Sequence, residues 1–81
     1  MELLHLSIVS PEKELFNGYV KSVELPGASG AFMILPRHAP IVSSLCAGKL
    51  KYVKDDGEKE VLNIQSGFIE MSNNSVIVCL A

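Results

Sequence analysis

Apolar and polar residues alternate along most of the chain, which is the pattern of half-buried β-strands. The clearest case lies near the N-terminus, where Leu4, Leu6 and Ile8 alternate with His5 and Ser7. A strand there must end at the Ser-Pro pair that follows, because proline cannot donate to the ladder. Further extended segments are predicted over residues 19–25, 31–35, 41–46, 49–54, 58–65, 68–72 and 76–80.

Turn-forming residues separate these segments. Asp56-Gly57 predicts a hairpin turn with charged residues at its tip, and Asn73-Asn74 predicts a second tight turn. Asn17-Gly18 is expected to be either a turn or a bulge, because positive φ is cheap for both residues. The segments therefore follow one another closely, as in a protein made of short strands.

Two segments carry expectations about packing. In the predicted hairpin, Leu50 and Tyr52 are expected to lie across from Leu62 and Ile64, in an antiparallel register that builds one apolar face. Residues 76–80 are apolar on both faces and rich in β-branched side chains. That composition predicts a central strand covered on both sides.

Residues 25–40 hold three of the four prolines and a Gly-x-x-Gly pair. Pro26 and Pro36 lack the backbone donor that a helix needs, and Gly27 and Gly30 permit positive φ. Only residues 31–35 can extend regularly between them. We expect one short apolar strand between two rigid turns, in the part of the chain where a function can be argued.

The number and spacing of these segments favour an all-β fold. Turn signals recur roughly every 8 to 12 residues, and no segment has a helical period. We expect a flattened antiparallel β-sandwich or barrel of about eight to ten short strands. At 81 residues, the chain has room for a single domain covering residues 1–81.

The apolar composition has two explanations, one of which is a protein partner. Hydrophobic residues make up 48% of the chain, which is rich for a domain of this size. Either strands are buried on both faces or a surface is reserved for a partner. The formal net charge of −2 gives no electrostatic reason to bind nucleic acid or anionic lipid.

No targeting or membrane segment is expected in this sequence. The N-terminal residues lack the basic region and the cleavage site of a signal peptide. The longest apolar run, residues 76–81, is far shorter than the roughly 18 residues of a spanning helix. Cys46 and Cys79 are expected to be reduced thiols in the core, with no third ligand for a metal cluster.

The residue patterns of known catalytic sites are not found. The Gly27 to Gly30 loop precedes no helix and lacks a Walker lysine, so it does not fit a phosphate loop. No serine lies in a Gly-x-Ser-x-Gly elbow, and the acidic residues of positions 55–60 cluster at a hairpin tip, where solvated charges are ordinary. His5 is expected to be a surface residue. We therefore expect no enzyme, no cofactor and no metal site.

His38 is the one polar residue that stands out. It is either a half-exposed turn histidine without a function or part of a protein contact surface beside the Gly-x-x-Gly loop. The residues alone favour the first interpretation, because turn histidines are common.

Several motifs together point to a known family. The most specific run reads Pro26-Gly27-Ala28-Ser29-Gly30-Ala31-Phe32-Met33-Ile34-Leu35-Pro36-Arg37-His38-Ala39-Pro40. Shorter matches are Ile8-Val9-Ser10-Pro11-Glu12, Phe16-Asn17-Gly18, residues 45–48 and Ser66-Gly67-Phe68-Ile69-Glu70. In this pattern the chain resembles, over its whole length, the N-terminal β domain of the epsilon subunit of F-type ATP synthases, called delta in mitochondria.

The resemblance implies a non-catalytic rotor subunit with a ten-stranded flattened β-sandwich. Such a domain packs against the foot of the gamma subunit and touches the polar loops of the c-ring, which couples ion flow to ATP synthesis. The implied location is peripheral, on the cytoplasmic face of the inner (plasma) membrane, as part of the F1 sector. The implied c-ring-facing residues are Gly27, Ala28, Ser29, Gly30, Ala31, Arg37 and His38, and the implied gamma-facing residues are Ser10 and Pro11 with the neighbouring sheet surface.

The chain departs from the family pattern in three places. Arg37 stands where the family usually has glycine, so a positive φ there would cost about 1 kcal/mol unless the turn differs or a contact offsets the strain. Ser29 and Ala31 stand where a glutamate is frequent, which weakens the case for ionic pairing with the c-ring. Family members commonly continue into a helical hairpin that restrains ATP hydrolysis, and this chain stops at Ala81. Coupling and assembly functions without that inhibition are expected.

Two alternatives stay open. A biotinyl or lipoyl carrier domain is also small and all-β, with a modified lysine at a hairpin tip, and Lys54 or Lys59 could be that lysine. Their neighbours lack the pattern that surrounds such a lysine. The other alternative is a free-standing interaction module with an unrelated partner.

Overall fold

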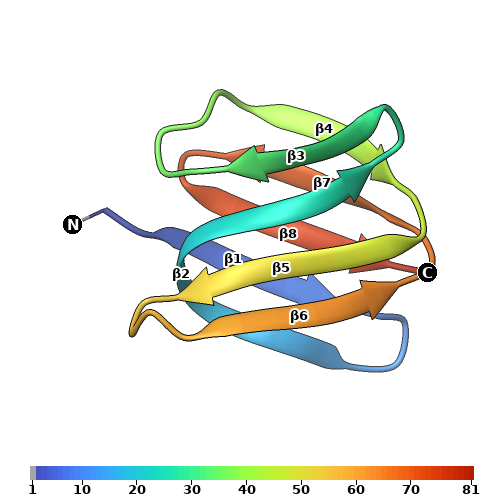
Figure 1. The fold of residues 1–81 in the computed structure, drawn as a ribbon, viewed down its shortest axis with the longest axis horizontal. Helices are drawn as coiled ribbons and strands as arrows, with labels where there is room; N and C mark the ends of the chain where they lie inside the picture. Colours follow the sequence, from blue (N-terminus) through green and yellow to red (C-terminus); the bar gives the residue numbers. More distant parts are fainter. Residues whose placement is uncertain (1) are drawn as a thin grey trace.

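The computed structural model describes residues 2–81, which form eight strands in two packed layers (Figure 1). The strands are β1 (Leu4–Val9), β2 (Glu14–Gly27), β3 (Gly30–Ile34), β4 (Ile41–Leu45), β5 (Gly48–Lys54), β6 (Lys59–Ile64), β7 (Gly67–Ser72) and β8 (Ser75–Leu80). The expected all-β class is confirmed. Nothing in residues 2–81 forms a helix with the length and apolar character needed to cross a membrane.

The longest strand, β2, belongs to both layers. Its N-terminal part pairs with β1, and its C-terminal part pairs with β3 and β5. The front layer in Figure 1 therefore holds β3, the C-terminal part of β2, β5 and β6, and the rear layer holds the N-terminal part of β2 with β1, β8, β7 and β4. The pairing of β2 with β5 shifts register between Val20 and Ser22, near the bend between the layers.

The strand pairing is antiparallel except at one place. The first and last strands, β1 and β8, lie side by side and run parallel, from the pair His5 with Ser75 to the pair Val9 with Cys79. The resemblance implies ten strands, whereas residues 2–81 form eight. One reason for the lower number is that the continuous β2 pairs in both layers, where two separate strands could otherwise stand.

The core lies between the layers and is entirely apolar. Alternate residues of β1, β7 and β8 point into it, as the period of two predicts. The buried side chains are Leu4, Leu6, Ile8, Val20, Val23, Leu25, Ile34, Leu45, Leu50, Ile64, Ile69, Met71, Val76 and Val78.

The predicted turns and their hairpins are found, with one difference in register. Leu50 pairs with Leu62 as expected, but Tyr52 pairs with Glu60, and Ile64 pairs with Gly48. The tight turn at Asn73-Asn74 is confirmed, since both residues have positive φ, 49° and 59°. This is the pair of conformations that a two-residue hairpin loop requires.

The expectation of a turn or bulge at Asn17-Gly18 is wrong. Both residues lie in regular register inside β2, where they pair with Ser7 and Leu6. Their types are explained by side-chain contacts instead. A Cβ on Gly18 would come within 3.1 Å of the Phe16 ring, so glycine leaves room for that ring.

Two burial expectations are also wrong. Strand β8 is central in the rear layer, but it is covered on one side only, because Ile77 is 41% exposed. Neither cysteine lies in the core: Cys46 is exposed in the connection after β4, and Cys79 is half-buried on the outer side of β8. Both are free thiols.

Candidate functional site

The expected interface residues lie in three turns at two ends of the sandwich. Residues 27–30 connect β2 to β3, and residues 35–40 connect β3 to β4. Because β3 separates them, the Gly27 turn and the turn with Arg37 and His38 lie at opposite ends of the molecule (Figure 1). Ser10 and Pro11 lie between β1 and β2, at the same end as the Gly27 turn.

The Gly27 to Gly30 turn has a rigid, exposed tip. Gly30 has φ of 125°, a conformation that side chains rarely adopt. A Cβ on Gly27 would come within 2.7 Å of the Phe32 ring and 2.8 Å of the Gly30 carbonyl oxygen. The Ala28 amide donates to the Ser44 carbonyl over 3.2 Å, which joins the turn to β4. Exposed residues of the tip are Ala28, Ser29, Gly30 and Ala31.

The Ser10 turn is held by its own hydrogen bonds. The Ser10 amide donates to the Lys13 carbonyl over 2.9 Å, and its hydroxyl both donates to that carbonyl and accepts from the Lys13 amide. Pro11 is exposed in this turn, while Ser10 is half-buried.

Arg37 adopts the conformation for which glycine is the usual residue. Its φ is 70°, and the His38 amide donates to the Leu35 carbonyl over 3.1 Å, closing a turn with Pro36 in second position. This arrangement is that of a type II turn, which requires positive φ in third position. A non-glycine residue there costs about 1 kcal/mol, so the strain expected from the sequence is present.

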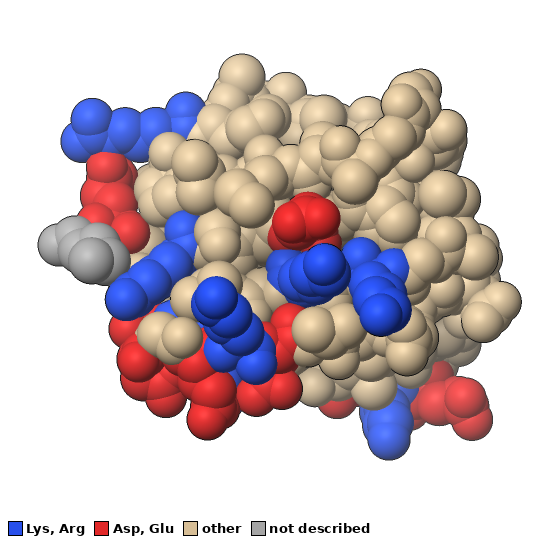
Figure 2. All heavy atoms as spheres, in the orientation of Figure 1, with Lys and Arg blue, Asp and Glu red and all other residues tan. Residues whose placement is uncertain are grey.

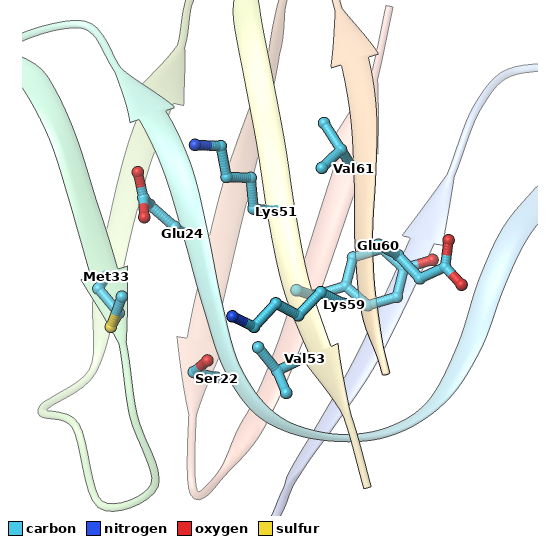
Figure 3. A pocket seen from close by; sticks show the side chains of 9 residues that line it. Ser22, Glu24, Met33, Lys51, Val53, Lys59, Glu60 and Val61 are labelled. Atoms are coloured by element: carbon cyan, nitrogen blue, oxygen red, sulfur yellow. The ribbon is translucent and has the colours of Figure 1, made fainter. Parts of the chain in front are cut away.

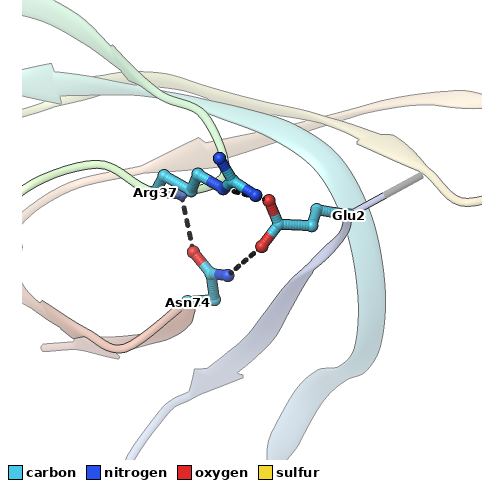
Figure 4. A network of polar contacts seen from close by, with 3 residues as sticks. All are labelled: Glu2, Arg37 and Asn74. Atoms are coloured by element: carbon cyan, nitrogen blue, oxygen red, sulfur yellow. Dashed lines mark hydrogen bonds and ion pairs between the residues drawn. The ribbon is translucent and has the colours of Figure 1, made fainter.

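Contacts around Arg37 offset the strain. Its amide donates to Asn74 Oδ1 over 2.7 Å, and its side chain Nε donates to the Glu2 carboxylate. Asn74 Nδ2 donates to the same carboxylate over 3.2 Å (Figure 4). Of the two explanations offered by the sequence, the contact is the one found. Asn74 was predicted only as a turn residue, and the sequence gives no signal for its side-chain contacts.

His38 is half-buried beside this turn. Its Nδ1 lies 2.6 Å from the carbonyl oxygen of the next residue, Ala39, to which it can donate. The bond orients the ring through its own chain rather than through a second side chain. Residues 2–81 hold no group of His, Cys, Asp or Glu side chains arranged to bind a metal ion.

The outer side of β1, β4, β7 and β8 in the rear layer, here called the rear face, is nearly free of charge. The N-terminal part of β2 belongs to the same layer but is not counted in this face, and it carries Glu14. Within residues 4–9, 41–45, 67–72 and 75–80, the only Asp, Glu, Lys or Arg is Glu70. Its cross-strand partners are Val42 and Ile77, which are 73% and 41% exposed. Phe68, two residues before Glu70 on the same side of β7, is 51% exposed.

The outer side of the front layer, here called the front face, is charged by contrast. Figure 2 shows acidic and basic side chains mixed over its lower part. A shallow hollow of about 330 Å³ lies across β2, β5 and β6 (Figure 3). Residues lining it include Ser22, Glu24, Met33, Lys51, Val53, Lys59 and Val61.

The lysines of the carrier alternative do not lie at a hairpin tip. Lys54 ends β5 and forms ion pairs with Glu58 at 2.8 Å and Glu60 at 3.6 Å. The hydrogen bond to Glu58 raises the pKa of Lys54. Lys59 begins β6 and lines the front hollow.

The comparisons with known proteins agree with this architecture. The family model described as "ATP synthase, Delta/Epsilon chain, beta-sandwich domain" matches residues 3–81. The chain is 45% identical over 78 residues to the ATP synthase epsilon chain of Wolinella succinogenes, which covers 96% of this chain and 60% of the relative. It is 42% identical over 78 residues to the ATP synthase epsilon chain of Caulobacter vibrioides, covering 96% of this chain and 90% of the relative.

The fold has a close counterpart among solved structures. A chain in the Euglena gracilis mitochondrial ATP synthase structure, which contains OSCP, F1 and the c-ring, superposes with a TM-score of 0.91 at 19% identity, over 96% of this chain and 50% of that chain. Several curated relatives are longer, and this chain spans about 60% of the Wolinella protein. The family match covers nearly all of the chain. The chain belongs to the ATP synthase delta/epsilon family, and residues 3–81 are its β-sandwich domain.

Proposed function

We propose that this chain is a non-catalytic coupling part of the rotor of an F-type ATP synthase, joining the gamma subunit to the c-ring. Family membership over residues 3–81 supports this function. The role is mechanical, because a close-packed sandwich deforms little and can transmit torque between two bound partners. As part of the F1 sector, it would lie peripherally on the cytoplasmic face of the inner membrane.

The nearly uncharged rear face is the observation that carries the gamma contact. Exposed apolar side chains in neighbouring strands are typical of a surface that a partner covers. Val42, Ile77 and Phe68 surround a single carboxylate, Glu70. Covering that carboxylate without a partner charge would be unfavourable, so the gamma surface opposite should carry a lysine or arginine.

The two ends of the sandwich are assigned to different partners. Residues 27–31 are proposed to contact the polar loops of the c-ring through the small residues 28–31, which are exposed, while Gly27 is buried. Because Ser29 and Ala31 carry no charge, this contact would use backbone groups and close approach rather than ion pairs. Arg37 and His38 lie at the other end, next to the turn between β7 and β8 in the rear layer. We therefore assign them to the margin of the gamma contact, together with Ser10 and Pro11 at its opposite edge.

A charge reversal on each face tests the gamma assignment. Glu70→Lys places a cation in the rear face, and Glu24→Lys makes the same change on the front face. Binding is measured to F1 that contains gamma and lacks its own epsilon subunit. Glu70→Lys should weaken binding at least about tenfold, since like charges at a buried contact cost several kcal/mol. Glu24→Lys should bind like the parent chain. Equal affinities for the two variants would contradict the assignment.

A further inference from the structure

Asn74 joins three parts of the chain that are far apart in sequence. Its side-chain oxygen accepts from the Arg37 amide over 2.7 Å, and its side-chain nitrogen donates to Glu2 over 3.2 Å. Its backbone carbonyl accepts from the His5 amide over 2.8 Å. The turn between β7 and β8 therefore holds both the entry to β1 and the turn after β3 (Figure 4).

Asparagine suits the backbone conformation at position 74. Its φ is 59°, in the left-handed region that asparagine tolerates better than most residues. Its neighbour Asn73 has a similar φ of 49°, but no side-chain hydrogen bond of Asn73 is found among residues 2–81. The two residues share a turn and a conformation, and they differ in these contacts.

The ion pair in the network is its weaker part. The side chains of Arg37 and Glu2 are 80% and 46% exposed, and exposed pairs contribute little because water and salt screen them. The hydrogen bond to the Arg37 amide fixes the backbone itself. It acts at the residue where positive φ is unfavourable for a side chain other than glycine.

We propose that Asn74 is a positioning residue, which holds the Arg37–His38 turn in the single shape that docks against gamma. The hydrogen bond from the Arg37 amide to Asn74 Oδ1 is here called the anchor. It stabilises at Arg37 the positive φ that a glycine would adopt without strain. Without it, the strained turn samples other shapes, and the partner must select the competent one, which lowers the apparent affinity. The docking part of this inference rests on the proposed function, whereas the anchor itself does not.

Asn74→Gly tests the anchor, and Asn73→Gly is its matched control. Glycine keeps the left-handed conformation at both positions and removes only the side chain. In the free chain, exchange of the Arg37 amide hydrogen should become roughly three to ten times faster in Asn74→Gly, as expected for the loss of one hydrogen bond. It should stay unchanged in Asn73→Gly. Asn74→Asp keeps an acceptor oxygen for the Arg37 amide, but its second oxygen would face the Glu2 carboxylate. It is therefore combined with Glu2→Gln, which removes the like charge, and this double variant should restore most of the protection.

Affinity for epsilon-free F1 is then measured for the same variants. Asn74→Gly should bind several-fold more weakly, mainly through faster dissociation. Asn73→Gly and the double variant of Asn74→Asp with Glu2→Gln should bind nearly like the parent chain. Unchanged Arg37 exchange in Asn74→Gly would overturn the anchor. Faster exchange with unchanged affinity would overturn its positioning role. If the parent chain itself does not bind F1, the proposed function fails, and the exchange rates still decide whether the anchor exists.

Discussion

Arg37 has a strained backbone angle, and side chains from distant parts of the sequence contact it there. Arg37 has φ of 70°, and its amide is paired with Asn74. The sequence indicated that a positive φ at this position would be strained, but it left open whether the turn differs or a contact offsets the strain. It could not predict the anchor, since the contact joins residues 37 positions apart and depends on how the two turns meet in the folded chain.

Tyr52 is a second residue whose surroundings have a measurable effect. Burial raises the pKa of Tyr52, and the nearby Glu60 carboxylate adds to the increase, while Lys54 opposes it. A raised pKa means that the folded chain holds the phenol proton more tightly than the unfolded chain does. Below the unfolded pKa of about 10 both states hold this proton, so ionisation of Tyr52 should not change the stability with pH. Above it the unfolded chain loses the proton first, and the free energy of unfolding should fall as the pH rises.

The Glu60 contribution can be measured directly. In a Tyr19→Phe background, tyrosinate absorbance reports Tyr52 alone, and Glu60→Gln should lower its titration midpoint because the repelling charge is removed. Asp55→Asn removes the same charge from the same hairpin and serves as the control, with no expected change in midpoint. A midpoint that stays in place or rises in Glu60→Gln would contradict this account of the shift.

At the scale of elements, alternation predicted the strands but not their environment. Leu4, Leu6 and Ile8 were correctly placed in a strand because a period of two follows from backbone geometry alone. Ile77 was wrongly expected to be covered, because composition cannot say whether a second layer lies over an apolar face. Asn17-Gly18 was misread as a turn or bulge because turn statistics do not contain side-chain contacts. Gly18 leaves room for the Phe16 ring, and the Asn17 side chain forms hydrogen bonds with His5 and Glu14.

At Gly67 the strands β7 and β8 approach so closely that a larger residue should lower the stability of the chain. A Cβ at this position would lie 2.4 Å from the Cys79 carbonyl oxygen, which belongs to the backbone of the neighbouring β8. Gly67→Ala should therefore force the strands apart and lower the free energy of unfolding by about 2 to 3 kcal/mol, as overpacking typically does. Urea unfolding measures the change. Ser66→Ala, at the exposed preceding residue, should change stability by less than about 0.5 kcal/mol. A Gly67→Ala chain as stable as the parent would refute the close contact.

At the scale of the whole molecule, the two outer faces differ in charge and the two ends carry different turns. The rear face has one charged residue, Glu70, within residues 4–9, 41–45, 67–72 and 75–80, whereas Lys51, Lys59 and Glu24 line the hollow on the front face. Every residue of this contrast can be read in the sequence, but the layer in which each residue lies cannot. It also did not reveal that Gly27 and His38, expected on one interface, lie at opposite ends of β3.

Under the proposed function, the separation of these surfaces would let gamma and the c-ring bind to the chain at the same time. Gamma would cover the rear face, and the c-ring would contact the end that carries residues 27–31. Each partner would then leave the other surface free. A chain that merely bound one of them could not transmit rotation.

The most direct measurement asks whether this chain bridges the two partners. F1 that contains gamma and lacks epsilon is mixed with detergent-solubilised c-ring from the same enzyme, with and without the chain, and complexes are separated by size. The chain should retain the c-ring on F1 in one complex that contains all components, and less of this complex should form without the chain. A chain that binds neither partner, or binds F1 without increasing the amount of c-ring retained, would contradict the account.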